Sequence, residues 1–381
     1  MIRLSRAISK VIVDEYGQQE FLRRLSDPLW FQAFGSVLGF DWHSSGVTTV
    51  VTGVLKQAMS PDLHGISIAG GKGKMSTTTK NDIPELAEKY YNLSSIKIKN
   101  LLYASRMAAK IDNAAVQDGY SLYHHVIFFD RYGDWAIIQQ GMSHISRMAR
   151  RYHWISDSIK SFVLEPHSGI ISEHKRSRVL DMTSINSTDN QRISVDLATG
   201  NTDNLRSTVS KVSSVLASMQ RYTLDRWFNS NSAYEDEHIG NKNFIEHYEM
   251  PRKLDWNLFK RIYDIHPQNY EQLISIPGVG PATVRALSLI GEIVYGSKAS
   301  WQDPVKYNFA HGGKDGVPYP VARNVYDNSI RYLSSAIEGA EIEREERIQS
   351  LKKLSQYSAR IFNTCENEKS ETRFGGFSID A

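Results

Sequence analysis

Residues 123–140 read YHHVIFFDRYGDWAIIQQ, and this stretch decides the fold class. Residues 123–129 and 135–139 are rich in β-branched and aromatic side chains, which favour strands. The segment between them, DRYGD, holds a glycine and two aspartates, which are typical turn residues. The pattern predicts a β-hairpin.

Helical patterns lie on both sides of this hairpin, so the chain is predicted to be α+β. We expect a mixed N-terminal domain with a short sheet and a mainly helical C-terminal domain. Apolar spacing predicts helices over 8–25, 83–91 and 96–115, and a short strand over 65–69. Residues 142–154 are also predicted to be helical, and residues 180–204 are polar enough to suggest an exposed linker. The predicted boundaries are 1–180 for the mixed domain, 181–243 for a linker and helix, 244–340 for a DNA-binding unit, and 341–381 for a charged helix and disordered tail.

Composition narrows the class of protein. The 381 residues are 41% hydrophobic and 23% charged, as in a globular domain, and the net charge is only +3. A nucleic-acid site must therefore be a local patch. The single cysteine, Cys365, excludes an internal disulfide framework and any multi-cysteine metal site. With no apolar run long enough for a membrane span and no signal-peptide pattern, we expect a cytoplasmic protein without a membrane partner.

Residues 269–295 read NYEQLISIPGVGPATVRALSLIGEIVY, two amphipathic helices around a glycine-rich turn. Pro281 suits the first position of the second helix, where its missing N–H is not needed. Gly278 and Gly280 let the backbone approach a phosphate, and the amides of Val279, Gly280 and the helix start near Thr283 can bind the anion. The segment resembles the helix-hairpin-helix motif of DNA-repair and replication proteins. Such a contact positions a protein on the DNA backbone and reads no sequence. The alternative is an ordinary pair of antiparallel helices.

Two basic segments are further candidates for DNA contact. Arg147, Arg150 and Arg151 alternate with aromatic residues, a mixture that suits phosphate binding and base stacking. The loop GGKGK offers Lys72 and Lys74, although it lacks the spacing of a Walker A loop. The alternative for each segment is a solvated surface.

Near the hairpin lie short segments that contain acidic residues and histidines, which are the residue types that metal-dependent nucleases use. We predict Asp112 and Asp118 as ligands of Mg²⁺ or Mn²⁺, and Lys110 as a stabiliser of the transition state. Either His43 or His124 would transfer the proton. His124 and His125 are adjacent on a strand and must face opposite sides, so at most one of them joins a given site. The acidic-x-Lys signature of restriction-type nucleases is missing from the second strand.

Two other functions stay open. Asp303 follows the hairpin at roughly the distance of the catalytic aspartate in helix-hairpin-helix DNA glycosylases, although Ala282 stands where lyase-competent members carry lysine. Asp303 can equally be a helix cap before Pro304. The third possibility is a non-catalytic DNA-binding or scaffold protein. All three belong to DNA repair or processing.

Several long blocks together resemble an uncharacterised prokaryotic family, the domain of unknown function 763. The resemblance extends to about residue 336 and implies no particular reaction. It also implies that relatives carry a further segment before the first helix, so we expect this chain to start within that region. The matching blocks are FLRRLSDPLWFQAFGSVLGFDWHSSGVTTVV (21–51), IAGGKGK (68–74), AAKIDNAAVQDGYSLYHH (108–125), QQGM (139–142), ARRYHW (149–154), IPGVGPATVRALSLIGEIVYG (276–296) and DPVKYNFAHGGKDGVPYPV (303–321).

Overall fold

A six-stranded sheet forms the centre of the computed structural model, which describes residues 1–40, 46–172, 175–229, 248–308 and 323–374. The predicted hairpin is confirmed, since β3 pairs antiparallel with β4 and Phe129 lies opposite Trp135. All neighbouring pairs are antiparallel except β6 and β8. The fold is α+β, as predicted. The strand order is β1 (Ile66–Lys72), β3 (Ser121–Asp130), β4 (Trp135–Met142), β5 (Ala149–Ile155), β6 (Gly169–Ser172) and β8 (Tyr307–Asn308).

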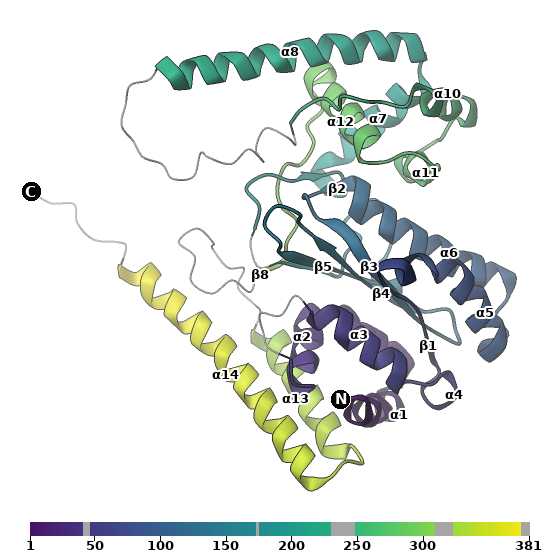
Figure 1. Ribbon diagram of the computed structural model, residues 1–381, viewed down its shortest axis with the longest axis vertical. Coiled ribbons are helices and arrows are strands. Elements are labelled where there is room, and N and C mark those ends of the chain that lie inside the picture. The colour runs from purple at the N-terminus through teal and green to yellow at the C-terminus, as the bar shows by residue number, and fades with distance from the viewer. Residues whose placement is uncertain (41–45, 173–174, 230–247, 309–322, 375–381) are drawn as a thin grey trace, which may run out of the picture.

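Each face of the sheet carries its own hydrophobic core, because side chains alternate along a strand. Val126 and Phe128 point into one core, which we call the N-terminal core. Ile127 and Phe129 point into the other, the α6 core. Figure 1 shows the sheet between the two groups of helices. Helices on both faces explain why the central strands are apolar on consecutive residues.

The N-terminal core is covered by helices from both ends of the chain. Asp27 caps α2 by accepting a hydrogen bond from Leu29 N, and Pro28 occupies the first turn. Gly17, with φ of 86°, marks a kink within α1. The covering helices are α1 (Ile2–Ser26), α2 (Pro28–Val37), α3 (Val47–Ala58), α13 (Arg323–Gly339) and α14 (Arg344–Phe374); the short α4 (Pro61–His64) precedes β1.

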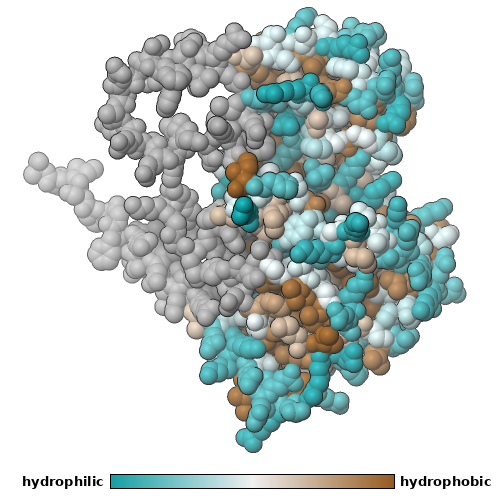
Figure 2. Space-filling model, in the orientation of Figure 1, coloured by the Kyte–Doolittle hydropathy of each residue, from teal (hydrophilic) through white to brown (hydrophobic). Residues whose placement is uncertain are grey.

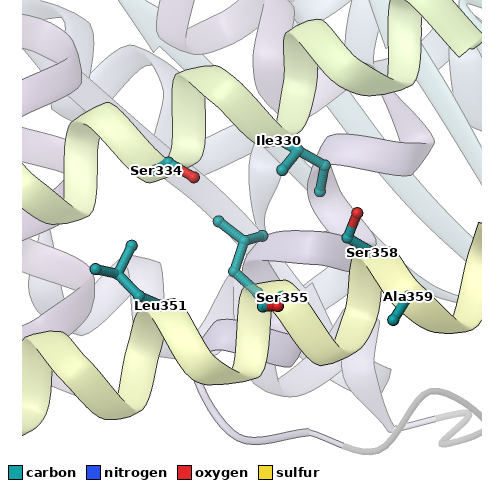
Figure 3. Close-up of a pocket in the computed structure, with 7 residues that line it drawn as sticks. Ile330, Ser334, Leu351, Ser355, Ser358 and Ala359 are labelled. Carbon is teal, nitrogen blue, oxygen red and sulfur yellow. The ribbon is translucent and has the colours of Figure 1, made fainter.

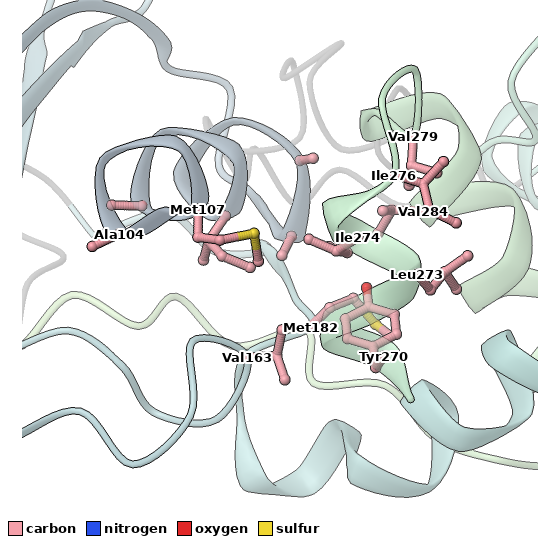
Figure 4. Packing of buried hydrophobic residues seen from close by; sticks show 14 of the residues in the cluster. Ala104, Met107, Val163, Met182, Tyr270, Leu273, Ile274, Ile276, Val279 and Val284 are labelled. Atoms are coloured by element: carbon pink, nitrogen blue, oxygen red, sulfur yellow. The ribbon is translucent and has the colours of Figure 1, made fainter. Parts of the chain in front are cut away.

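The α6 core is covered by α5 and α6 and by a group of helices from the second half of the chain. Helix α6 continues into one π-helical turn, Ile111–Ala115. Figure 4 shows Ile274 of the second group pointing toward Met107 of α6, with Tyr270 near Met182 in the same core. The elements are α5 (Thr79–Tyr91), α6 (Ser95–Lys110), α7 (Thr188–Thr199), α8 (Thr202–Asn229), α10 (Trp256–Ile265), α11 (Tyr270–Ser275) and α12 (Pro281–Tyr295), with a small sheet of β2 (Val116–Gln117) and β7 (Leu180–Asp181).

Two segments differ from the prediction. Residues 142–154 were expected to be helical, but β5 occupies the second half of this stretch, because pairing with β4 and β6 on both sides outweighs helix propensity. Residues 180–204 are not an exposed linker. They form β7, α7 and the start of α8, and several of their polar side chains are buried with partners, as when Asn190 Nδ2 donates to the Ser288 and Ser297 carbonyls.

The surface carries both hydrophilic and hydrophobic residues. Figure 2 shows hydrophilic residues over most of the visible face, with a larger hydrophobic patch in its lower half beside the residues drawn in grey. Within the described part of the chain, no helix is both long and apolar enough to cross a bilayer.

Candidate functional site

The segment from α11 to α12 has an exposed turn. Pro277 and Gly278 are exposed, while Val279 is buried and anchors the turn from below. Gly278 has φ of 98°, a conformation that favours glycine. Gly280 precedes α12 with φ of −136°, and a side chain there would meet only the Gly278 carbonyl, at 3.8 Å. Within the described residues no side chain caps the start of α12, so its first amides have no side-chain acceptor. Thr283, in the first turn, is buried.

Lys110 anchors this turn to α6. Its Nζ donates to the Ile276 carbonyl at 2.6 Å, and Gln117 Nε2 donates to the Pro281 carbonyl at 2.8 Å. Burial, assisted by the nearby charge of Arg106, lowers the pKa of Lys110 to about 8. Lys110, which was predicted to stabilise a transition state, thus contacts the backbone beneath the turn and holds the turn in position.

Arg150 joins Asp118 and Asp303 in a buried cluster. Its NH1 donates to Asp118 Oδ2 and Asp303 Oδ1, each at 3.0 Å, and its NH2 donates to Asp303 Oδ2 at 2.7 Å. Tyr152 Oη also donates to Asp118 Oδ2, at 2.6 Å. The amides of Arg176 and Val305 complete the shell of Asp303. Burial raises the pKa of Asp118, against the opposing effect of Arg150.

Asp112 belongs to a separate buried network. It accepts hydrogen bonds from Gln139 Nε2 at 2.5 Å and Trp154 Nε1 at 3.0 Å, and it pairs with His167 Nε2 at 2.5 Å. Gln139 Oε1 in turn lies 2.7 Å from His125 Nδ1, whose other ring nitrogen lies 2.8 Å from Ser105 Oγ. Burial lowers the pKa of His125. The network ties α6 to three strands.

These contacts bear on the predicted chemistry. Asp112 and Asp118 lie in different networks, each already bonded to protein partners. The described residues contain no group of three or more histidine, cysteine, aspartate or glutamate side chains suited to a metal ion. Arg150 binds both oxygens of Asp303, and the role of Asp303 in glycosylase chemistry stays a prediction. The requirement for Mg²⁺ or Mn²⁺ stays a prediction.

The predicted basic segment is not a surface. Arg150 is 0% exposed on the α6-core face, and Arg151 is 5% exposed on the other face. Arg151 donates to the side chains of His153 and Gln32. Burial lowers the pKa of Arg151 to about 9, which leaves the guanidinium cationic at neutral pH. Arg147 is exposed and remains available to a phosphate.

The other predicted residues lie apart from the turn. Lys72 and Lys74 are exposed at the end of β1 and in the 3₁₀ turn Gly73–Thr77 that follows. His124 is buried against α3, where its Nε2 lies 3.0 Å from Thr52 Oγ1. As predicted, His124 and His125 face opposite sides of the sheet. His43 lies outside the described residues.

A cavity of about 370 Å³ lies between α13 and α14, far along the chain from these networks. Figure 3 shows Ile330 and Ser334 of α13 facing Leu351 and Ser355 of α14 across it. Its lining consists of serine and aliphatic side chains and carries no charged group.

Sequence reasoning missed Gln32, Thr48, Thr52 and His153, which surround Arg151 and His124. They are ordinary polar residues of helices and a strand, and only the packing of α2 and α3 on the sheet brings them together. The sequence placed His124 on one face of a predicted strand, but it predicted a helix around Arg151, so no signal in the sequence brought these two residues together.

Comparison with known proteins identifies a family whose function is unknown. No curated protein and no solved structure is significantly similar to the chain. The family model described as protein of unknown function (DUF763) matches residues 1–321, which is most of the chain and includes the sheet, the α11–α12 turn and both buried networks. The chain therefore belongs to the DUF763 family.

Proposed function

We propose that the protein binds the DNA backbone through the exposed turn between α11 and α12 and acts in DNA repair or processing. The observation that carries the proposal is the open approach to Gly280 and the uncapped start of α12. Backbone amides at a helix start, together with the helix dipole, favour an anion such as a DNA phosphate. The likeness of residues 269–295 to a helix-hairpin-helix motif supports the same function.

Two cations add to the local field. Arg261 is exposed beside the turn and donates to the Pro277 carbonyl at 3.3 Å. Lys110 lies beneath the turn on the Ile276 carbonyl. Neither cation lies within 4 Å of the Cβ position at Gly280, so a phosphate can approach this glycine while positive charge lies close by.

Gly280→Leu tests the proposal. The backbone at Gly280 tolerates a side chain, but leucine would occupy the space that a phosphate needs. We expect weaker binding to duplexes of any sequence. The slope of log affinity against log salt should fall by about one for each phosphate that the variant no longer binds. The measurement is fluorescence anisotropy with labelled duplex DNA over a salt series.

Gly53→Leu is the matched control, because Gly53 also has open space beyond its Cβ position but lies on α3. The control should bind as the parent does. A folded Gly280→Leu variant with parental affinity and salt slope would restrict the turn to a structural role. Adding Mg²⁺ or Mn²⁺ to labelled duplex, single-stranded and branched DNA tests, in the same samples, whether binding leads to cleavage.

A further inference from the structure

Four polar side chains form a row across β1, β3, β4 and β5, on the sheet face that α3 covers. The register places Lys72 opposite His124, His124 opposite Gln140, and Gln140 opposite Arg151. Directly opposite residues have Cβ atoms about 5 Å apart, so the row is continuous. A register shift between Leu122 and His124 adds Tyr123 to it, and Gln140 Nε2 donates to Tyr123 Oη at 2.6 Å.

Within the described residues, the row contains a buried positive charge with no carboxylate beside it. Arg151 donates to His153, Gln32, Thr48 and the Pro28 carbonyl, and its Cζ lies 4.6 Å from the centre of the Phe31 ring; all of these groups are neutral. This contrasts with Arg150, one residue earlier, which has two carboxylates. A buried charge is normally paired, so the Arg151 environment favours an added anion.

His124 supplies a buried polar atom without a partner. Thr52 donates its hydroxyl to the Thr48 carbonyl at 2.8 Å, so its oxygen accepts from His124 Nε2. The proton of the neutral ring therefore sits on Nε2, and Nδ1 carries a lone pair. Nδ1 is buried and has no hydrogen-bond partner among the residues that the structure describes, while the residue is 2% exposed. An unmade hydrogen bond of this kind is costly unless a ligand completes it.

We propose that this row is a binding site for a phosphomonoester group, with one proton shared between a phosphate oxygen and His124 Nδ1. A phosphate monoester ionises for the second time near pH 6, so it can bring that proton or leave it on the imidazole. A sulfate or an internal phosphodiester carries no such proton at neutral pH. At the buried end of the row, Arg151 provides a positive electrostatic potential that attracts the phosphate. At the other end, the exposed Lys72 provides a mobile cation.

Lys72 and Tyr123 form the accessible rim. The Lys72 Nζ lies 5.9 Å from the centre of the Tyr123 ring, and its charge is felt at His124. Lys74 is equally exposed but lies beyond the strand, outside the row. The two lysines are therefore a matched pair for a test. The site is separate from the α11–α12 turn and does not depend on DNA binding there.

The test is a histidine imidazole NMR experiment on the full chain labelled with ¹⁵N-histidine. Without ligand, the His124 Nδ1 resonance should be that of an unprotonated nitrogen. Inorganic phosphate should shift it, whereas sulfate at matched ionic strength should not.

Lys72→Ala should raise the apparent Kd for phosphate about tenfold, as expected when one charge-assisted hydrogen bond is removed. Lys74→Ala should leave it within about twofold.

Oligonucleotides then distinguish free phosphate from a strand end. If a 5′- or 3′-phosphorylated strand reproduces the shift and the unphosphorylated strand does not, the ligand is a nucleic-acid end. If only inorganic phosphate causes the shift, the ligand is the free ion.

The proposal fails if phosphate leaves the His124 resonances unchanged at saturating concentration. It also fails if sulfate shifts them equally, or if the two lysine variants weaken binding to the same degree. The parent protein alone decides the first two outcomes, so a misfolded variant does not remove the test. Loss of duplex binding in Gly280→Leu with phosphate binding intact would separate this site from the DNA proposal.

Discussion

At the residue scale, the buried carboxylates have partners that no local pattern reveals. Asp118 and Asp303 are 185 positions apart, yet both bind one guanidinium. Their neighbours in sequence suggested a metal ligand for the first and a cap or catalytic group for the second. Both suggestions used the chemistry of an isolated carboxylate. Arg150, predicted to bind a phosphate, pairs with both of these side chains.

The Arg150→Met variant should be strongly destabilised. Removing the guanidinium leaves two buried carboxylates without their counter-charge, which costs about 3–5 kcal/mol of the free energy of unfolding. Urea denaturation measures the change, and Arg147→Met is the control because Arg147 is exposed.

The same variant should depend on pH in a definite direction. Burial already raises the pKa of Asp118, and loss of Arg150 raises that pKa further. The folded variant then holds a proton that the unfolded chain releases at the ordinary carboxyl pKa. Its free energy of unfolding should therefore fall as the pH rises from that value through the raised pKa. A variant as stable as the parent at every pH would contradict the role given to this cluster.

At the element scale, the turn between α11 and α12 contains two glycines with different structural roles. Gly278 adopts φ of 98°, and a Cβ there would lie 3.2 Å from Leu258 Cδ1 and 3.1 Å from Arg261 NH2. Gly280 has neither restriction. The first glycine shapes the turn, and the second keeps its surface open.

Gly278→Ala should therefore lower the free energy of unfolding by about 1–2 kcal/mol, the cost of a left-handed backbone with a side chain. Gly280→Ala should change it by less than about 0.5 kcal/mol. Thermal unfolding followed by circular dichroism compares the two variants directly. Equal stability of the two would mean that the turn adopts a different conformation from the one described here.

At the scale of the whole molecule, the C-terminal helices complete a core that begins at residue 4. Leu354 and Tyr357 of α14 are buried in the N-terminal core, and Tyr357 Oη donates to the Leu29 carbonyl at 3.1 Å. Figure 1 shows α13 and α14 beside the N-terminal helices. The family match ends at residue 321, so these helices lie beyond the matched region and yet cover it.

Leu354→Ala should consequently destabilise the protein by about 2–5 kcal/mol, as for other buried leucines. Ile348→Ala, on the same helix but 55% exposed, should change stability by less than about 0.5 kcal/mol. Urea denaturation of the two variants gives the comparison. If both substitutions are silent, α14 does not pack on this core in solution.

The sequence by itself determined the hairpin, the main N-terminal helices, the α11–α12 segment and the opposite orientation of His124 and His125. Each follows from periodicity or turn chemistry within a short window. Tertiary structure decided that residues 149–155 are a central strand, because neighbouring strands supply the hydrogen bonds that favour it. It also decided which charges meet. Arg150 and Arg151 are adjacent and chemically identical, but one faces two carboxylates and the other, among the described residues, only neutral groups, since the sheet has two faces and different helices cover each.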